Sequence, residues 1–293
     1  MKVFIIGASG LVGSHCMLAF KEHRWDVKGS HLNFATPETV SFDVLNEDLE
    51  KFFNEIKFIP DLIIHCAALT NVDYCETNQE ESYKSTVAPT VKIVDFCSKK
   101  AIKLVYISTD YVFDGENGPY LEDSKVNPIN VYGKHKLKCE ELVSELSEFL
   151  ILRITNVYGE ESRKKNFISR LLVDMKGNIE KTLNLPYDQF ATPIYAGDIA
   201  RMTFMLVENR KTGIYNLSST DYYNRFQLAS KVKSYFSSNT SFKLNAVKTS
   251  DSQQTALRPL KGGLLNVKFV CEFPEFQFTN VDAFIIKSLK NGI

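Results

Sequence analysis

The sequence predicts an α/β protein with a Rossmann-like, doubly wound parallel sheet and a smaller C-terminal substrate lobe. Two observations carry this prediction. A glycine-rich turn at residues 7–13 joins an apolar strand-like run to an apolar helical pattern. Short apolar runs then alternate with helical patterns as far as Gly159. Continuous apolar strands separated by crossover helices are typical of a parallel sheet that is covered on both faces.

The individual elements follow in chain order from the same patterns. The predicted strands of the first half are residues 3–6, 26–28, 62–65, 104–108 and 150–153. The predicted helices between and after them are residues 11–23, 48–55, 80–99 and 131–147. After Gly159 we expect helices at 166–176, 196–208 and 226–236, and strands at 182–185 and 214–217.

The turn at residues 7–13 has the spacing Gly-x-x-Gly-x-x-Gly. Glycines permit a tight turn, and without a Cβ they let a pyrophosphate approach the backbone N–H groups at the start of the helix. A turn with no ligand is the alternative. The position between strand and helix favours a dinucleotide site. We therefore expect residues 1–160 to form an NAD(P)-binding Rossmann domain. Residues 161–293 would form a substrate-binding lobe, with segments at about 182–220 returning to the sheet.

A second motif, Tyr132-x-x-x-Lys136, begins a predicted helix. Residues four apart share a helix face, and an ammonium beside a phenol lowers the phenol's pKa, so Tyr132 is a candidate proton donor or acceptor. Thr109 ends a predicted buried strand. Its hydroxyl can donate a hydrogen bond to the substrate carbonyl oxygen that Tyr132 would protonate. The Tyr-x-x-x-Lys pattern alone is common by chance, and it gains weight from the glycine-rich turn. We predict Thr109, Tyr132 and Lys136 as the catalytic residues.

The expected cofactor contacts extend along the ends of several predicted strands. They are Gly7, Ser9, Gly10, Leu11, Val12, Gly13, Ser30, His31, Asp43, Val44, Cys66, Ala67, Ala68, Tyr132 and Lys136. Asp43 is expected at the adenine, with a solvated loop acid as the alternative. An acid closing the second strand usually binds the ribose hydroxyls of NAD, but Asp26 comes too early in that strand. Ser30, His31 and Lys28 can accommodate a 2′-phosphate, which favours NADP, with NAD possible.

Composition and charge exclude several classes of partner. The chain has 35 basic and 35 acidic residues, and no Lys/Arg run suggests nucleic acid or an anionic membrane as the main partner. The six cysteines form no Cys-x-x-Cys, and the five histidines form no metal constellation, so no metal is predicted. The first apolar stretch is too short for a signal peptide or a membrane helix. A reducing cytoplasm fits these features best.

The chain resembles the dTDP-4-dehydrorhamnose reductase family, an extended branch of the short-chain dehydrogenases/reductases. The matching blocks occur in family order from end to end. They are the glycine turn at 7–13, Ala-Ala-Leu-Thr-Asn-Val-Asp at 67–73 with Glu76, residues 108–115, Asn-Pro at 127–128, residues 130–136, Arg153 with Val-Tyr-Gly at 157–159, Asn-Phe at 166–167, Asp-Gln at 188–189 with Thr-Pro at 192–193, and Arg-Pro at 258–259.

The resemblance implies roles for particular residues. Tyr132 would be the general acid, Lys136 its partner and Thr109 the hydroxyl that orients the carbonyl. The residues implied in substrate binding are Thr70, Asp110, Tyr111, Asn156, Asn166, Gln189 and Arg258. Asn156 stands where many members have tryptophan, which leaves the substrate open. For Arg258, pairing with a substrate phosphate and an ordinary surface position are the two alternatives. A homodimer is possible, and His15 argues against one bridged by metal.

Three functions remain open on the sequence alone. The first is NADPH-dependent reduction of the 4-keto group of a nucleotide-diphospho-deoxysugar, which would make the protein an NAD(P)-dependent oxidoreductase. The second is an epimerase or dehydratase for nucleotide sugars that holds NAD tightly. The third is a catalytically silent, NADP-binding regulatory subunit. The intact set Thr109, Tyr132 and Lys136 favours the first.

Overall fold

The computed structural model describes residues 1–161, 163, 165–236 and 241–292. Its centre is a seven-stranded parallel sheet with the strand order β3-β2-β1-β4-β5-β6-β9. The strands are β1 (Lys2–Ile6), β2 (Asp26–His31), β3 (Thr39–Ser41), β4 (Leu62–His65), β5 (Lys103–Thr109), β6 (Phe149–Ile154) and β9 (Gly213–Leu217). This order, with β1 beside β4, is that of a doubly wound sheet, and it confirms the predicted fold class.

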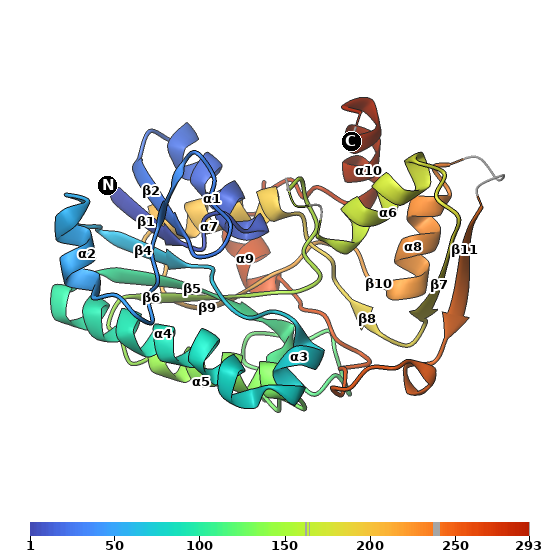
Figure 1. Ribbon diagram of the computed structural model, residues 1–293, viewed down its shortest axis with the longest axis horizontal. Helices are drawn as coiled ribbons and strands as arrows, with labels where there is room; N and C mark the ends of the chain where they lie inside the picture. Colours follow the sequence, from blue (N-terminus) through green and yellow to red (C-terminus); the bar gives the residue numbers. More distant parts are fainter. Residues whose placement is uncertain (162, 164, 237–240, 293) are drawn as a thin grey trace.

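Helices cover both faces of this sheet (Figure 1). One face packs against α1 (Leu11–Glu22), α7 (Ala196–Glu208) and α9 (Val267–Glu272). The other packs against α2 (Leu49–Glu55), α4 (Gln79–Lys100) and α5 (Val131–Val143). The short α3 (Val72–Thr77) lies beside α4 and α5. Strands buried from both sides explain the continuous apolar runs of the sequence.

The helices and strands of the lobe lie to one side of the large sheet (Figure 1), and they have an apolar core of their own. Three helices, α6 (Phe167–Lys176), α8 (Arg225–Lys233) and α10 (Val281–Lys290), pack against the parallel pair β7 (Lys181–Pro186) and β11 (Phe242–Val247). A short antiparallel pair, β8 (Phe190–Ala191) and β10 (Tyr223–Asn224), lies between the lobe and the large sheet. The single-turn helices η1 (Asp110–Val112) and η2 (Thr249–Asp251) complete the elements.

The segment at about residues 182–220, which was expected to return to the sheet, is divided between the large sheet and the lobe. The helix α7 covers the large sheet and β9 is its edge strand, as the apolar pattern of these residues suggests. The strand β7 differs from the expectation, because it pairs with β11 in the lobe. Phe242, Leu244 and Ala246 of β11 alternate with Lys243 and Asn245, as in a strand, but no strand was predicted there, so β7 had no expected partner other than the large sheet. Among the residues that the structure describes, no helix is long and apolar enough to cross a membrane.

Candidate active site

A cleft of about 960 Å³ opens at the carboxyl ends of the sheet strands, where the strand order reverses between β1 and β4. Ligands of doubly wound sheets bind at this position. The cleft is lined by all of the predicted catalytic and cofactor-binding residues and by five of the seven predicted substrate-binding residues. These five are Thr70, Asp110, Tyr111, Asn156 and Asn166. Segments far apart in the sequence therefore meet in one cavity.

The glycine turn is packed too closely for any side chain at two of its positions. Gly7 has a φ of +82°, and a Cβ there would lie 2.9 Å from the backbone nitrogen of Ala67. A Cβ on Gly13 would lie 2.4 Å from the carbonyl oxygen of Gly7. The helix α1 begins after Gly10 with no side-chain cap and no acidic residue in its first turn. Its first N–H groups are thus available to an anion, and the turn fits a pyrophosphate.

The end of β2, where a 2′-phosphate would lie, carries no acid. Ser30 is buried, and His31 Nδ1 lies 2.8 Å from the hydroxyl of Thr39 in β3. The carboxylate of Asp43 lines the cleft and accepts hydrogen bonds from the backbone N–H of Leu45 and the side chain of Asn46, at 2.9 and 2.8 Å. Asp43 thus closes its own turn while facing the cavity.

Arg163 is a cleft residue that the sequence patterns missed. Its guanidinium lies 5.3 Å from the ring centroid of Phe34, just beyond β2, and one of its nitrogens would be 3.9 Å from a Cβ on Gly10. Arg163 is thus a cation beside the glycine turn. The residue belongs to an irregular segment after Gly159, so no periodicity or strand end pointed to it.

The catalytic candidates converge on the end of β5. Thr109 is buried at the last position of this strand, and Tyr132 and Lys136 lie one turn apart on α5. The Asn130 side chain caps α5 by accepting a hydrogen bond from the backbone N–H of Gly133, at 2.8 Å. The rings of Tyr132 and Tyr111 meet edge to face, with centroids 5.6 Å apart. A carbonyl between Thr109 and Tyr132 would therefore find two hydroxyl donors.

The expectation that Lys136 lowers the pKa of Tyr132 is wrong for this structure. Burial raises the pKa of Tyr132, and the hydroxyl of Thr109 opposes this only in part. The ammonium of Lys136 instead donates to the carbonyl oxygen of Ile107, at 2.6 Å, and lies 4.0 Å from the ring centroid of Tyr106. Burial lowers the pKa of Lys136 to about 8. Helical spacing predicted a shared face, but not the backbone acceptor that turns the ammonium away.

A buried ion pair holds α5 against the sheet below these residues. Arg153 of β6 donates to both oxygens of Glu140 of α5, with the shortest distance at 2.8 Å, and both side chains are almost fully buried. Ser108, adjacent to Thr109, donates to the same carboxylate at 2.5 Å. Arg153 also donates to the backbone carbonyl of Glu122, at 3.0 Å. Because Glu140 lies one turn after Lys136, this network sets the position of α5 relative to the end of β5.

Asp110 joins three segments at the substrate side of the cleft. Its carboxylate accepts hydrogen bonds from the hydroxyl of Thr155, at 2.7 Å, and from the backbone N–H of Gly263, at 3.2 Å. The hydroxyl of Thr109 lies 3.4 Å from its other oxygen. Burial raises the pKa of Asp110, although these donors oppose the rise. The residue thus ties the ends of β5 and β6 to the C-terminal segment.

Two predicted substrate residues lie outside the cleft. Arg258 donates to the carboxylate of Asp73, at 2.7 Å, and to the carbonyl oxygen of Ala256, at 3.0 Å. Gln189 donates to the side chains of Thr249 and Gln254, at 3.0 and 2.7 Å. Both side chains therefore hold the segment around residues 249–258 in place. Asp73 also accepts a hydrogen bond from the backbone N–H of Ala256.

The remaining predicted substrate residues are held by local geometry. Asn166 caps α6 by accepting the backbone N–H of Ser169, at 3.1 Å, and donates to the carbonyl oxygen of Gly159. Asn156 follows β6 with a φ of +41°, a conformation that asparagine tolerates better than most residues. Its side-chain oxygen accepts a hydrogen bond at 3.2 Å from Arg225, the first residue of α8. Arg225 and Arg170 of α6 also line the cleft, and the sequence patterns missed both.

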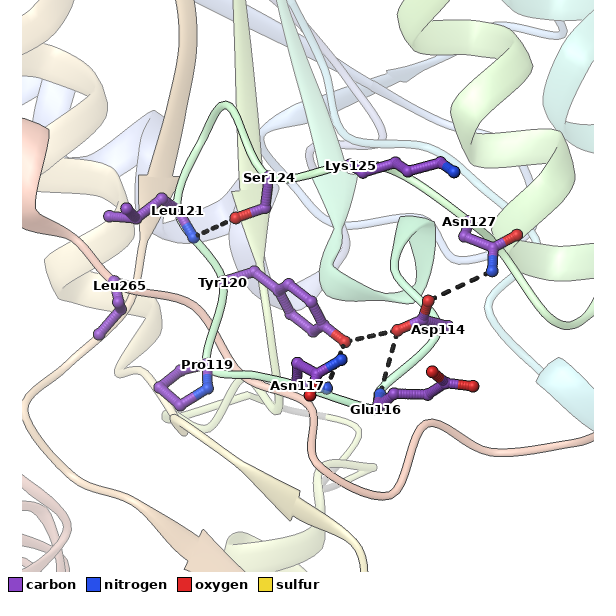
Figure 2. Close-up of a pocket in the computed structure, with 10 residues that line it drawn as sticks. All are labelled: Asp114, Glu116, Asn117, Pro119, Tyr120, Leu121, Ser124, Lys125, Asn127 and Leu265. Carbon is purple, nitrogen blue, oxygen red and sulfur yellow. Dashed lines mark hydrogen bonds between the residues drawn. The ribbon is translucent and has the colours of Figure 1, made fainter.

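A second hollow, of about 630 Å³, lies away from these residues on the loop after η1 (Figure 2). The carboxylate of Asp114 accepts from the hydroxyl of Tyr120, at 2.6 Å, from the backbone N–H of Glu116, at 3.0 Å, and from the side chain of Asn127, at 3.2 Å (Figure 2). These groups satisfy one another and fold the loop. Within the described ranges, no group of three or more His, Cys, Asp or Glu side chains is arranged to hold a metal ion.

Comparison with known proteins now adds to this geometry. A family model described as RmlD substrate binding domain matches residues 1–280. The chain belongs to this family. A dTDP-4-dehydrorhamnose reductase from Bacillus anthracis, solved in complex with NADP, is 26% identical, covers 99% of both chains and has a TM-score of 0.84. A structure from Sulfolobus tokodaii, described as a hypothetical dTDP-4-dehydrorhamnose reductase, is 31% identical over 97% of this chain and 98% of that chain, with a TM-score of 0.84. The resemblance to the dTDP-4-dehydrorhamnose reductases is therefore confirmed.

Two relatives of this chain have names that describe different roles. Methionine adenosyltransferase 2 subunit beta from Xenopus laevis is 31% identical over 78% of this chain and 70% of that protein. A protein of Haloferax volcanii, named as a low-salt glycan biosynthesis reductase, is 33% identical over 75% of both chains. One name describes a subunit of an enzyme and the other a reductase, so the family alone leaves the activity open.

Proposed function

We propose that this protein uses NADPH to reduce the 4-keto group of a nucleotide-diphospho-deoxysugar. The observation that carries the proposal is the convergence of Thr109, Tyr132 and Lys136 in the same cleft as the glycine turn. Family membership and the reductase named from Haloferax volcanii support an oxidoreductase. The reductase from Bacillus anthracis was solved with NADP, which supports a nicotinamide dinucleotide as cofactor.

The residues present fit such a cofactor, because the turn at Gly7 and Gly13 excludes any Cβ and leaves the first N–H groups of α1 uncapped. When bound, NADPH supplies the hydride. Tyr132, whose pKa is raised by burial, holds its proton at neutral pH and donates it to the carbonyl oxygen as negative charge develops there. The hydroxyl of Thr109 bonds the same oxygen, and the charge of Lys136 stabilises it through space.

The experiment for this proposal is a screen of nucleotide-linked 4-keto sugars with NADPH, followed by loss of absorbance at the wavelength of the reduced cofactor. A reductase consumes NADPH in step with product. An epimerase regenerates its cofactor and shows no net consumption. If no 4-keto sugar consumes NADPH, although the protein binds it, the proposed reaction is wrong.

The choice of NADPH over NADH rests on the end of β2, where no carboxylate follows Ser30 and Arg163 lies near Gly10. We expect calorimetry to show tighter binding of NADPH than of NADH. A new carboxylate in Ser30→Asp repels the 2′-phosphate and is expected to reverse this order. Tighter binding of NADH to the unchanged protein would contradict the proposal.

A second candidate function is that of an NADP-binding regulatory subunit, and the similarity to methionine adenosyltransferase 2 subunit beta favours it. This function needs the cleft for binding but makes no use of a proton donor. It is supported if the protein binds NADPH, changes the activity of a partner enzyme, and if Tyr132→Phe leaves that effect intact. The complete set of Thr109, Tyr132 and Lys136 makes the reductase our first choice.

A further inference from the structure

Two cysteine thiols meet where α1 packs against the end of β4. Cys16 is a fully buried residue of α1 and belongs to the apolar core on that face of the sheet. Cys66 follows β4, packs against the same core, and lines the cleft with a half-buried side chain. The two thiols are hydrogen-bonded to each other. A thiol that solvent can reach, in contact with a second thiol, is the arrangement found in cysteine pairs that respond to oxidants.

The other four cysteines do not share this arrangement. All six lie in the part of the chain that the structure describes, and of these only Cys66 lines the cleft. The thiols of Cys75 and Cys139 are buried and donate to backbone carbonyl oxygens, at 3.5 and 3.6 Å. Burial raises the pKa of Cys97 to about 12, so it stays a thiol. Cys271 is exposed on α9.

The surroundings of the pair set the order in which the two thiols react. The hydrogen bond to Cys66, together with burial, raises the pKa of Cys16 well above its usual range, so Cys16 keeps its proton. Cys66 is close enough to Lys136 for their charges to interact. A thiolate formed at Cys66 therefore has an ammonium near it, and the thiolate is the form that attacks an oxidant. Cys66 is thus the first thiol to react and Cys16 the second.

We propose that Cys66 is a site of modification by hydrogen peroxide and that Cys16 resolves it into a disulfide between α1 and the end of β4. In the first step the Cys66 thiolate attacks the peroxide. An S–O bond forms, the O–O bond breaks, and the hydroxide that leaves takes up the proton released by the Cys66 thiol. In the second step the Cys16 sulfur attacks the Cys66 sulfur. The S–S bond forms, the S–O bond breaks, and water leaves with the Cys16 proton. The two thiols lose two electrons, and one peroxide is reduced to two waters.

The disulfide changes the cleft at the end where the cofactor is proposed to bind, and this consequence rests on the proposed function. A covalent bond holds two sulfurs closer than a hydrogen bond does, so it draws Cys66 toward α1. The next residue, Ala67, packs directly on Gly7, where a Cβ would lie 2.9 Å from the Ala67 backbone nitrogen. A shift of the chain at Cys66 therefore displaces the glycine turn. We expect the disulfide form to bind NADP⁺ about tenfold more weakly, comparable to the loss of one hydrogen bond to a charged group.

The test is treatment of the full chain with hydrogen peroxide, followed by peptide mapping with mass spectrometry. We expect one joined pair of peptides that contain Cys16 and Cys66. Dithiothreitol is expected to separate these peptides and to restore the NADP⁺ affinity measured by calorimetry. The matched control is Cys271→Ser, which removes the exposed thiol and is expected to leave the joined peptides unchanged.

A second variant, Cys16→Ala, distinguishes a resolving pair from a single oxidisable cysteine. Its small apolar side chain suits the buried position and leaves every side chain that lines the cleft in place. Without a resolving thiol, Cys66 is expected to advance to the sulfinic acid, which dithiothreitol does not reverse. After peroxide and then dithiothreitol, NADP⁺ affinity should therefore return in the unchanged protein and not in the variant.

Three results would overturn the proposal. These are a Cys66 that peroxide leaves unmodified, a Cys66 that becomes sulfinic acid in the unchanged protein without a link to Cys16, and a full recovery of Cys16→Ala with dithiothreitol. A disulfide form with unchanged NADP⁺ affinity would contradict the proposed effect on the cleft. If the reduced protein does not bind NADP⁺, the proposed function fails, and the joined peptides still decide the disulfide on their own.

Discussion

The phenol of Tyr132 sits where burial favours the protonated form, and its hydrogen-bonding neighbour is the hydroxyl of Thr109. A phenol that keeps its proton suits donation to a carbonyl oxygen, the direction of a reductase. Tyr132→Phe removes the oxygen alone and retains the edge-to-face contact with Tyr111. We expect turnover to fall by about two to four decades, the span of a lost general acid. Affinity for NADPH, measured by calorimetry, is expected to stay within about twofold. Near-normal turnover would make Tyr132 a packing residue.

The protonation of Lys136 is expected to control the alkaline side of the pH profile of kcat/KM. Burial lowers its pKa to about 8, against an ordinary value of 10.5, so the ammonium is charged below about pH 8 and neutral above it. The groups around it are His65, which burial keeps neutral, the Tyr106 ring, and Cys66, Cys139 and Glu140, whose charges oppose the shift. Because the proposed reaction needs the charge, we expect kcat/KM to fall as pH rises through about 8. A profile that stays level to pH 10 would contradict this role.

The shifted pKa of Lys136 also affects how the free energy of unfolding depends on pH, and this effect can be measured without an activity assay. Between about pH 8 and 10.5 the unfolded chain binds more protons at Lys136 than the folded protein does, so this residue makes stability rise with pH. Lys136→Met removes that contribution. In urea titrations we expect Lys136→Met to have a larger free energy of unfolding than the unchanged protein. The difference between the two is expected to shrink from pH 8 to pH 10. A constant gap would show that Lys136 titrates normally in the folded protein.

At the scale of elements, the buried ion pair between Glu140 of α5 and Arg153 of β6 fixes the position of α5 on the sheet. Removing one partner of a buried pair leaves an uncompensated charge and costs about 3–5 kcal/mol. We expect Glu140→Gln to lower the free energy of unfolding by about 3 kcal/mol in urea titrations. The adjacent Glu141 pairs with Lys138 on the surface at 3.0 Å, and Glu141→Gln is expected to cost less than about 0.5 kcal/mol. Equal effects of the two changes would mean that the network does not hold α5.

The elements also show what periodicity can and cannot predict. Long apolar patterns such as those of α1, α4 and α7 marked their helices within a few residues. The short strands β3, β8 and β10 and the single-turn helices carried too few residues for a period to be visible. Their positions depend on contacts between distant segments, such as the pairing of β8 with β10 across more than thirty residues of chain.

At the scale of the whole molecule, the two parts of the chain are interleaved. The glycine turn and the Tyr-x-x-x-Lys motif were visible in the sequence because each is local, and each lies where the motif implies. The place of Arg163, Arg170 and Arg225 in the cleft was not visible in the sequence, because only the packing of the lobe against the sheet brings these cations there. The same reason explains why Gln189 and Arg258, which follow family motifs, lie outside it.

Interleaving predicts that residues 1–160 do not fold alone. The strand β6 pairs with β9 along five residues, and α7 and Phe269 complete the apolar core on the face covered by α1. A chain ending at residue 160 exposes that edge and that face. We expect it to be aggregated or to show no cooperative unfolding by circular dichroism, whereas the full chain unfolds cooperatively. A soluble fragment with a sharp transition would contradict this.

The place of β9 and α9 in the sheet also has a consequence for synthesis on the ribosome. The half that carries the glycine turn emerges first, but the last strand of its sheet ends at Leu217 and its core also includes Phe269. Residues as far as Phe269 must therefore be synthesised before this half can complete its packing. Until then the nascent chain presents apolar surface, and it is a natural client for chaperones that hold such surfaces during translation.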